Sequence, residues 1–502
     1  VTLEHDAKVS NVGGHGRGGT AKVDKARTDK TRTDKTKMDK KAILTWIDEN
    51  RAPFEALALK IWGAPELAYQ EHETSRLQME FLRQRGFEVT RKGDMPTAFM
   101  AEWGTGGPTI GILGEYDALA GMSQTVSAEI EAVVPKAPGH GCGHNLLGVG
   151  GLFAACAAKE ALAAHGVKGT VRYYGCPAEE VLTGKGDMTK AGYFLDGTDV
   201  ALTWHPNDSS SVTAATLTAM ASAKFRFKGI SAHAGGAPEA GRSALDAVEL
   251  MNVGANYLRE HMVAQDRLHY VITNGGLAPN IVPSEAEVWY FARAPHDGEL
   301  ASLWRRLVKV ARGAALMTET DVEIELLGGC YNTLPNLVLN GVLEKNLCEF
   351  AGPVSYSEEE RQFALEIQNS LPEGQRDAAL SRMPEGSETL LNTTPLPCFD
   401  AGRFVMASSD VGDVANIMPT SMIWAATWPL GVPPHSWQAV ACAGCSLGLK
   451  GMVLAAKALA GSVYDLVSDP DIVRRAREEF DARRRGKAYR PIGELLGSGD
   501  AE

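Results

Sequence analysis

The chain has 502 residues and a formal net charge of −12. This length exceeds what one ordinary hydrophobic core organises, so two domains are expected. The acidic balance argues against a nucleic-acid partner, which would call for a basic face. We find no run of 18 apolar residues and no secretory leader pattern in the sequence. We therefore expect no membrane span and a cytoplasmic location.

The first 40 residues differ in composition from the rest. Residues 1–41 contain 11 Lys or Arg and 6 Asp or Glu, and they include the near-repeat TDKTRTDKTKMDK. A segment with so few apolar side chains cannot bury a core, so residues 1–40 are predicted to be a disordered tail. The GHGRGG stretch within it has the letters of a phosphate loop but follows no strand, so it predicts no nucleotide site.

Apolar residues then recur with a helical period from residue 42 to residue 61, and a second helix is expected to end at Gly86. Three short apolar strands follow, at residues 109–117, 171–176 and 200–205. Each of them stops at polar residues. Strands that alternate with helices predict an α/β sheet, with ligands gathered at the carboxyl ends of its strands.

Residues 219–332 change to the order strand, helix, strand, strand, helix, strand, which is typical of a small α+β unit. We interpret it as an insertion into a discontinuous catalytic domain made of residues 41–218 and 333–485. The stretch 350–400, rich in Glu, Pro and Ser, is expected at the surface. Residues 486–502 are expected to be a C-terminal tail.

The eight cysteines are scattered and suggest no disulfide framework. Cys442 and Cys445 form a lone C-x-x-C within the small-residue run ACAGCSLG. We interpret this pair as helix packing rather than a redox or metal site.

Two clusters have residues suited to metal chemistry. In GHGCGHNLLG (139–148), Cys142 and His144 are two residues apart and can face the same side of a loop. On its own, such a stretch could equally be structural. Glu179 and Glu180 follow a strand and a turn. A bare Glu pair usually faces solvent, but at a strand end one Glu can bind a cation while the other takes a proton.

Two further histidines complete a possible ligand set. His205 ends the third predicted strand and His435 lies far downstream in PPHSWQ. Each alone is compatible with a structural histidine. Together with the two clusters they are sufficient ligands for one or two cations of borderline softness.

The sequence resembles the aminoacylase/carboxypeptidase family of dinuclear metallohydrolases. The resemblance covers residues 42–470 and rests on eight co-linear motifs: LGEYDALAG (113–121), GHGCGHNLLG, YGCPAEE (174–180), LTWHP, FKGISAHAG (227–235), GRSALDAV (241–248), SSDVGDV (408–414) and PPHSWQ (433–438). It implies a mixed-sheet α/β metallohydrolase catalytic domain with an inserted α+β lid or dimerisation domain.

The resemblance also implies roles for individual residues. Each protomer would hold two divalent metal ions, Mn or Zn, through five ligands: Cys142, His144, Glu180, His205 and His435. Glu179 would be the general base, and Asp117 would orient the metal site from behind.

In the inserted domain, His233 matches a histidine that reaches a partner subunit's active site and helps to hold the oxyanion. Asn280 and Arg293 match positions that bind a substrate carboxylate or carbonyl. Arg293 could instead pair with Glu285 or Glu287. The implied partner is a second copy or a homologous subunit, which gives a homodimer or a heterodimer.

Two positions depart from many relatives, which have Asp where this chain has Glu115 and Asn145. Neither change removes an expected ligand. Both are shared with the branch that hydrolyses p-aminobenzoyl-glutamate, which favours that branch over hydrolysis of auxin conjugates. We therefore expect a metal-dependent amidohydrolase that acts on an N-acyl or N-aroyl amino acid.

Two other classes of function are less compatible with the sequence. An inactive binding or regulatory subunit is disfavoured because every expected ligand and the base are present. A dinucleotide-binding α/β enzyme is disfavoured because no G-x-G-x-x-G follows a strand within a βαβ unit.

Overall fold

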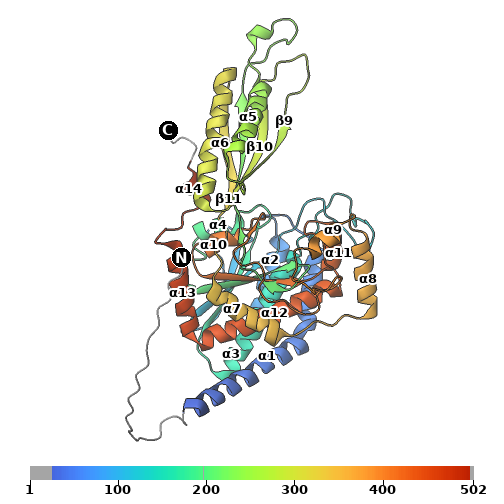
Figure 1. Ribbon diagram of the computed structural model, residues 1–502, viewed down its shortest axis with the longest axis vertical. Helices are drawn as coiled ribbons and strands as arrows, with labels where there is room; N and C mark the ends of the chain where they lie inside the picture. Colours follow the sequence, from blue (N-terminus) through green and yellow to red (C-terminus); the bar gives the residue numbers. More distant parts are fainter. Residues whose placement is uncertain (1–24, 196, 498–502) are drawn as a thin grey trace, which may run out of the picture.

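A seven-stranded mixed sheet forms the centre of the larger domain in the computed structural model, which describes residues 25–195 and 197–497 (Figure 1). The strand order is β1-β2-β4-β3-β5-β13-β6. The strands are β1 (Glu88–Thr90), β2 (Phe99–Gly104), β3 (Thr109–Glu115), β4 (Thr170–Cys176), β5 (Val200–Asn207), β6 (Ser211–Val212) and β13 (Thr420–Ala426). The four central strands β4, β3, β5 and β13 are parallel, and the outer strands are antiparallel.

Helices cover both faces of this sheet, which is why its parallel strands are apolar along most of their length. On one face, α3 (His144–His165) and α12 (Ser446–Ser468) pack next to each other on the sheet, and the long helix α1 (Lys25–Trp62) packs against both. On the other face lie α4 (Gly184–Lys190) and α10 (Val411–Ala415). The remaining helices of this domain are α2 (His72–Arg83), α7 (Leu337–Lys345), a π-helical turn (Asn346–Ala351), α8 (Glu358–Asn369), α9 (Gln375–Leu380), α11 (Trp437–Ala443) and α13 (Pro470–Arg484).

Helices α3 and α12 are each long and apolar enough to cross a membrane by length and composition alone. In the fold, 83% of the apolar window of α3 and 78% of that of α12 are buried inside the protein. Their apolar side chains therefore contact the sheet, α1 and each other.

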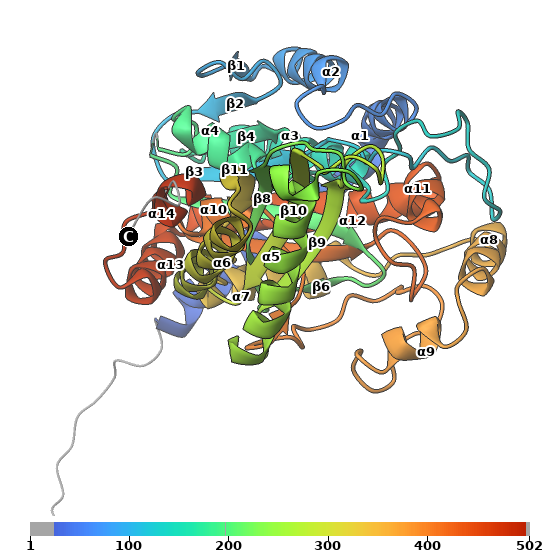
Figure 2. The ribbon, with the colours of Figure 1, turned by 90° about the horizontal axis from the view of Figure 1, so that it is seen from above.

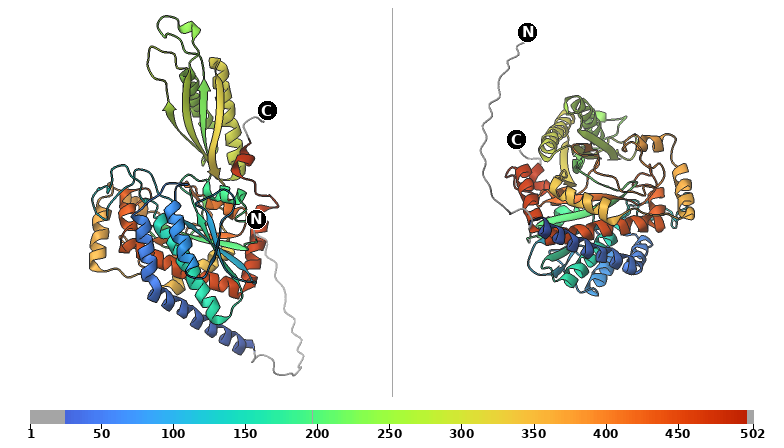
Figure 3. Two further views of the ribbon diagram at one scale, coloured as in Figure 1. Left: turned by 180° about the vertical axis from the view of Figure 1, so that it is seen from behind. Right: turned by 60° about the horizontal axis from the view of Figure 1, so that its bottom comes forward.

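The smaller domain is a four-stranded antiparallel sheet of order β11-β8-β10-β9 with two helices on one face (Figure 2). Its elements are β8 (Ala219–Lys228), η1 (Pro238–Ala240), α5 (Ala244–Leu258), η2 (Arg259–His261), β9 (Arg267–Asn274), β10 (Glu285–Ala294), α6 (Asp297–Thr318) and β11 (Asp321–Cys330). Alternate residues of β10, among them Val288, Tyr290 and Ala292, are buried beneath α5 and α6. The residues between them face the opposite side of the sheet, which the helices leave uncovered (Figure 3, left).

The fold is the expected mixed-sheet α/β domain with an inserted α+β domain. The chain enters the smaller domain at β8, which begins at Ala219, and leaves it at β11, which ends at Cys330. A short parallel pair, β7 (Thr216–Leu217) with β12 (Phe404–Val405), lies next to this junction.

The ends of the chain differ from the expected tails. Residues 25–40 belong to α1, and residues 1–24 of the expected N-terminal tail lie outside the described residues. At the other end, α14 (Ile492–Leu496) packs on β11 and α6, and both Ile492 and Leu496 are buried in the core of the smaller domain. Composition could not reveal this, because two apolar residues four apart suffice to anchor one helical turn.

The stretch 350–400 is more buried than its composition predicted. Ala364 and Ile367 of α8 are fully buried, in a cluster that also contains Trp428 and Cys442. Cys442 is buried at the end of α11, as the interpretation of helix packing required, and all eight cysteines are free thiols.

Candidate metal and active site

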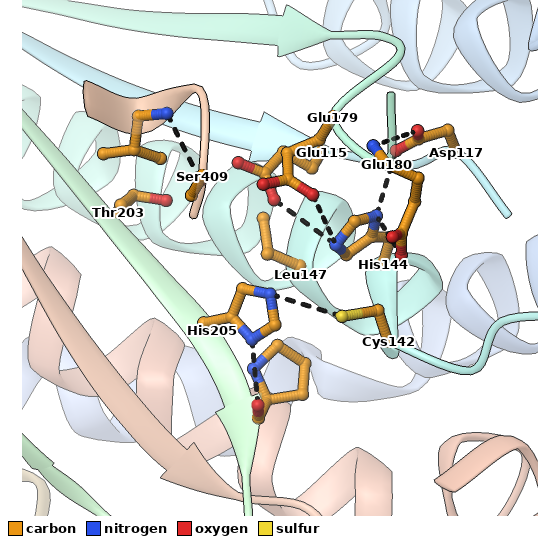
Figure 4. A network of polar contacts seen from close by, with 12 residues as sticks. Glu115, Asp117, Cys142, His144, Leu147, Glu179, Glu180, Thr203, His205 and Ser409 are labelled. Carbon is orange, nitrogen blue, oxygen red and sulfur yellow. Dashed lines mark hydrogen bonds and ion pairs between the residues drawn. The ribbon is translucent and has the colours of Figure 1, made fainter. Parts of the chain in front are cut away.

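The expected site residues come from loops at the carboxyl ends of three parallel strands. Asp117 follows β3, Glu179 and Glu180 follow β4, and His205 lies near the end of β5. Because these strands are neighbours and parallel, their ends meet at one edge of the sheet. His144 and Cys142 reach the same edge from the start of α3 (Figure 4).

Three residues in the loops of this site adopt the left-handed backbone conformation. Gly143 has φ 70°, a left-handed conformation that turns the chain between Cys142 and α3, and a Cβ there would meet Pro206 at 2.9 Å. Ala178 and His435 adopt the same region with φ 57° and 60°. For residues with a Cβ this conformation costs on the order of 1–3 kcal/mol and is concentrated at functional sites.

The ligand candidates form two groups that share one thiol. Ligand atoms of Cys142, His144 and His205 lie within 4.8 Å of one another, and so do those of Cys142, Glu180 and His435. The Cys142 Sγ atom is 3.6 Å from His205 Nε2, and His435 Nε2 is 3.2 Å from a Glu180 oxygen. Bonds of 2.0–2.3 Å around a tetrahedral cation place neighbouring ligand atoms roughly 3.3–3.6 Å apart. The residues present would therefore fit divalent cations in two neighbouring ligand groups that share Cys142.

Hydrogen bonds fix which histidine nitrogen is available to a cation. His144 Nδ1 is 3.0 Å from Asp117 Oδ1, and His205 Nδ1 is 2.9 Å from the Pro206 carbonyl oxygen. Each Nδ1–H donates to its oxygen, so each Nε2 presents a lone pair. Asp117 also accepts the backbone N–H of Glu180 at 2.8 Å. It therefore orients two ligands at once, in the role that the resemblance implies.

Several buried polar atoms in this site have no hydrogen-bond partner, among them His144 Nε2, Glu180 Oε1 and Glu115 Oε2. Buried polar atoms are normally paired, and such a group calls for an ion or water. The donor set of one thiol, imidazoles and carboxylates suits a divalent cation of borderline softness.

Burial sets the protonation of the neighbouring groups. Burial, followed by the charges of Glu115 and Asp410, raises the pKa of Glu179 well above its usual range. Burial and the nearby His144 lower the pKa of His205 to about 4, so this imidazole is neutral and able to bind metal at physiological pH. Burial also raises the pKa of the Cys142 thiol, which a bound cation would offset.

The site opens into a cleft of about 1020 Å³ between the two domains. The larger domain contributes Cys142, Glu179, Glu180, His205 and His435 to its lining, and the smaller domain contributes Met220, Trp289, Phe291 and Arg293. Arg293 is the only Lys or Arg among the described lining residues. It donates to Ser408 Oγ at 2.8 Å. Glu287 pairs with Lys224 and Arg226 instead of Arg293.

His233 and Asn280 are placed elsewhere. Both are exposed: His233 follows β8, and Asn280 lies in the loop between β9 and β10. The two loops are adjacent, because Ala234 N donates to the Asn280 carbonyl oxygen. Neither lines the cleft of its own chain. His233 Nδ1 accepts from the backbone N–H groups of Gly235 and Gly236 at 3.1 and 2.9 Å. Since Nδ1 acts as an acceptor, Nε2–H is left as the donor of this ring.

Three buried charged residues next to the site were not predicted from the sequence. Lys185 of α4 contacts both Glu115 and Asp410, and Glu71 accepts from the Ala178 N–H at 2.9 Å. Asp410 lies within the SSDVGDV motif, which was the only available signal. Lys185 and Glu71 occupy positions that sequence alone does not distinguish from surface charges.

Comparison with known proteins identifies the class to which this fold and site belong. Residues 216–317 match a family model described as a peptidase dimerisation domain. The chain is 40% identical to one of the subunits of p-aminobenzoyl-glutamate hydrolase from Escherichia coli, over 86% of this chain and 93% of that protein. It is 31% identical to the Xaa-Arg dipeptidase of Mus musculus, over 87% of this chain and 91% of that protein.

A solved structure shares the fold. A dinuclear metal-binding peptidase of the M20 family from Bacillus subtilis superposes with a TM-score of 0.55 at 16% identity, covering 85% of this chain and 99% of that one. The chain belongs to the M20 family of metallohydrolases. It is a hydrolase of amide bonds, and within the family it is similar to the p-aminobenzoyl-glutamate hydrolase of Escherichia coli.

Proposed function

We propose that the protein uses two divalent cations, Zn²⁺ or Mn²⁺, to hydrolyse the amide bond of an N-aroyl amino acid of the p-aminobenzoyl-glutamate kind. The observation that carries this proposal is the position of Glu179 beside two ligand groups that share Cys142, at the floor of an apolar cleft containing one arginine. The similarity to the Escherichia coli p-aminobenzoyl-glutamate hydrolase supports the same substrate class.

The side chains that line the cleft are complementary to an aromatic ring joined to a carboxylate. Trp289, Phe291 and Trp424 line it and supply flat apolar surfaces for an aromatic ring. Arg293 supplies a planar cation that can bind a carboxylate through two parallel hydrogen bonds. Because Ser408 Oγ accepts one Nη1–H of Arg293, the guanidinium is held in place before substrate binds.

The residues divide the work as follows. When bound, the two cations would supply Lewis acidity to the carbonyl and the attacking water. Glu179 takes a proton from the attacking water and returns it to the leaving amine. The raised pKa of Glu179 suits this exchange, because a carboxyl group that acts as base and then as acid needs a pKa near the working pH. Cys142, Glu180 and the three histidines hold the cations, and Asp117 keeps His144 and Glu180 oriented.

We also propose that active sites are completed across a dimer interface. The free edge of β9 and the outer side of α5 expose apolar side chains, including Tyr257 at 73% and Val271 at 54%. An unpaired apolar strand edge is a template for pairing with another strand. Joining two copies, or this chain and a homologous subunit, through this face would leave the His233 loop free to reach the partner's cleft.

A hydrolysis screen tests the proposed activity. Metal-stripped protein, given Zn²⁺ or Mn²⁺, should cleave p-aminobenzoyl-glutamate faster than acyl amino acids of equal charge that lack the ring, because the aromatic walls would be unfilled. Indoleacetyl-aspartate tests the auxin-conjugate alternative. Full turnover by protein holding less than about a tenth of a metal ion per chain would contradict the mechanism, and absence of any amide hydrolysis would favour a regulatory subunit.

A further inference from the structure

Glu115, at the carboxyl end of β3, has one satisfied and one unsatisfied carboxylate oxygen. The residue is 1% exposed. Its Oε1 atom accepts from Lys185 Nζ at 2.6 Å, whereas Oε2 has no hydrogen-bond partner. Leaving a buried carboxylate oxygen unpaired is costly, so Oε2 calls for a cation or a donor.

Lys185 fixes the orientation of this carboxylate. The lysine is fully buried and its ammonium lies between Glu115 and Asp410. Its backbone N–H also donates to Asp410 Oδ2 at 2.8 Å. Held at both its backbone and its side chain, Lys185 leaves Glu115 little freedom to rotate, and the second oxygen of Glu115 stays directed at the metal site.

The unpaired oxygen faces a metal-binding nitrogen. Glu115 Oε2 is 3.4 Å from His144 Nε2, which is also without a hydrogen-bond partner (Figure 4). This separation equals the edge of a tetrahedral coordination sphere with bonds of about 2.1 Å. The corresponding Glu179 oxygen is farther away, at 3.9 Å. Glu115, His144 and Glu179 also form a group whose ligand atoms lie within 4.8 Å of one another.

We propose that Glu115 is a direct ligand of the cation bound by His144, and that Lys185 is the residue that positions it. This inference rests on the proposed two-metal function. It gives the two cations unequal environments. The cation bound by His144 gains a buried carboxylate ligand, because His144 belongs both to the group with Cys142 and His205 and to the group with Glu115. The cation at Cys142, Glu180 and His435 keeps an open position, which is the usual property of a catalytic site.

The first test uses the unaltered protein. Anomalous diffraction from crystals of the Mn²⁺-loaded wild type should show two metal peaks, with Glu115 Oε2 about 2.0–2.3 Å from the peak nearest His144. Two peaks with this oxygen more than about 3.5 Å from either would overturn the inference and leave the proposed function intact. Fewer than two peaks would count against the two-metal function, and the ligand assignment would then fall with it.

The second test measures affinity by competition between the protein and a chelator. Glu115→Gln should bind one Zn²⁺ as tightly as the wild type and the second roughly 100-fold or more weakly, while Lys185→Met should weaken the same ion roughly 10–100-fold. Glu102→Gln is the matched control, because it removes the carboxylate of another strand ion pair, with Arg172 at 2.6 Å, away from the site. Unchanged affinity for both ions in a folded Glu115→Gln protein would overturn the assignment.

Discussion

At the scale of single residues, Glu179 and Glu180 are adjacent in sequence but differ in their contacts. Glu180 lies 3.2 Å from His435, within a ligand group that includes Cys142. Glu179 lines the cleft 3.9 Å from His144 Nε2, and the charges of Glu115 and Asp410 act on it. A turn with a left-handed Ala178 directs the two side chains to these different places.

Substituting each of the two separates metal binding from proton transfer. Glu179→Ala should lower kcat by about 10²–10⁴-fold or more while both metals stay bound, since a general base contributes on this order. Glu180→Ala should also lose metal. Metal analysis of the purified variants checks the assignment, which is reversed if Glu179→Ala is the variant that empties the site.

Glu71 provides a pH-dependent prediction. Burial, followed by the charge of Asp117, raises the pKa of Glu71 from 4.5 to about 7. The folded state therefore holds a proton that the unfolded state releases between these values. The resulting stabilisation is fully present below about pH 4.5 and is lost as the pH rises through about 7.

Glu71→Gln removes this titration. Urea unfolding at pH 5 and pH 8 should show the wild type losing free energy of unfolding relative to Glu71→Gln at the higher pH. The exposed Glu88→Gln serves as the control and should track the wild type at both values. A difference between wild type and Glu71→Gln that stays constant with pH would show that Glu71 does not titrate in this range.

At the scale of elements, periodicity predicted most of the chain. Short apolar runs that stop at polar residues predicted β3, β4 and β5, and the change of pattern near residue 219 predicted an inserted domain. The strand β2 and the strand β13 were not predicted, because their apolar runs resemble buried helix segments as much as strands. The motifs predicted candidate ligands at strand ends, and Glu179, Glu180 and His205 lie there, but their role as ligands stays a prediction. The Lys185–Glu115 pair was beyond reach, because its partners are 70 residues apart and no local pattern links them.

The short helix α14 illustrates an element whose stability comes from tertiary packing. A helix of five residues does not form on its own, so its two buried side chains must hold it. Ile492→Ala or Leu496→Ala should lower the free energy of unfolding by about 2 kcal/mol or more. Glu494→Ala, on the exposed side of the same helix, should have little effect. Denaturant titration and limited proteolysis of the smaller domain measure both, and equal effects of all three would argue against docking.

At the scale of the whole molecule, the position of His233 bears on assembly. The five candidate ligands belong to the larger domain, whereas His233 lies in the smaller one, in the loop between β8 and η1 (Figure 1). With Nδ1 occupied by two backbone donors, its Nε2–H is available to an oxyanion in another chain's cleft.

Mixed dimers test this arrangement if the protein is a homodimer. His233→Ala should keep both metals and lose roughly 10²–10³ in rate, the usual size for one oxyanion donor. Mixing it with His205→Ala should recover activity, up to about a quarter of the wild-type rate for random pairing of two protomers. No recovery in a verified mixed dimer would show that each site is complete within one chain.

The C-terminal segment changes how the two domains can move. Two connections, into β8 and out of β11, lie side by side because Met220 pairs with Cys330, and two adjacent strands alone would act as a hinge. The chain then returns from α13 through residues 485–491 and anchors α14 in the smaller domain. Two hydrogen bonds hold this returning segment: the Tyr489 hydroxyl donates to Asp413, and the Tyr331 hydroxyl donates to the Arg490 carbonyl oxygen.

A third attachment placed off the hinge axis acts as a tether of fixed length. Seven residues span at most about 25 Å when fully extended, so the smaller domain can swing away from the larger one only until this segment is taut. The width to which the cleft opens for a substrate is therefore set by a segment that contributes no residue to the lining of that cleft.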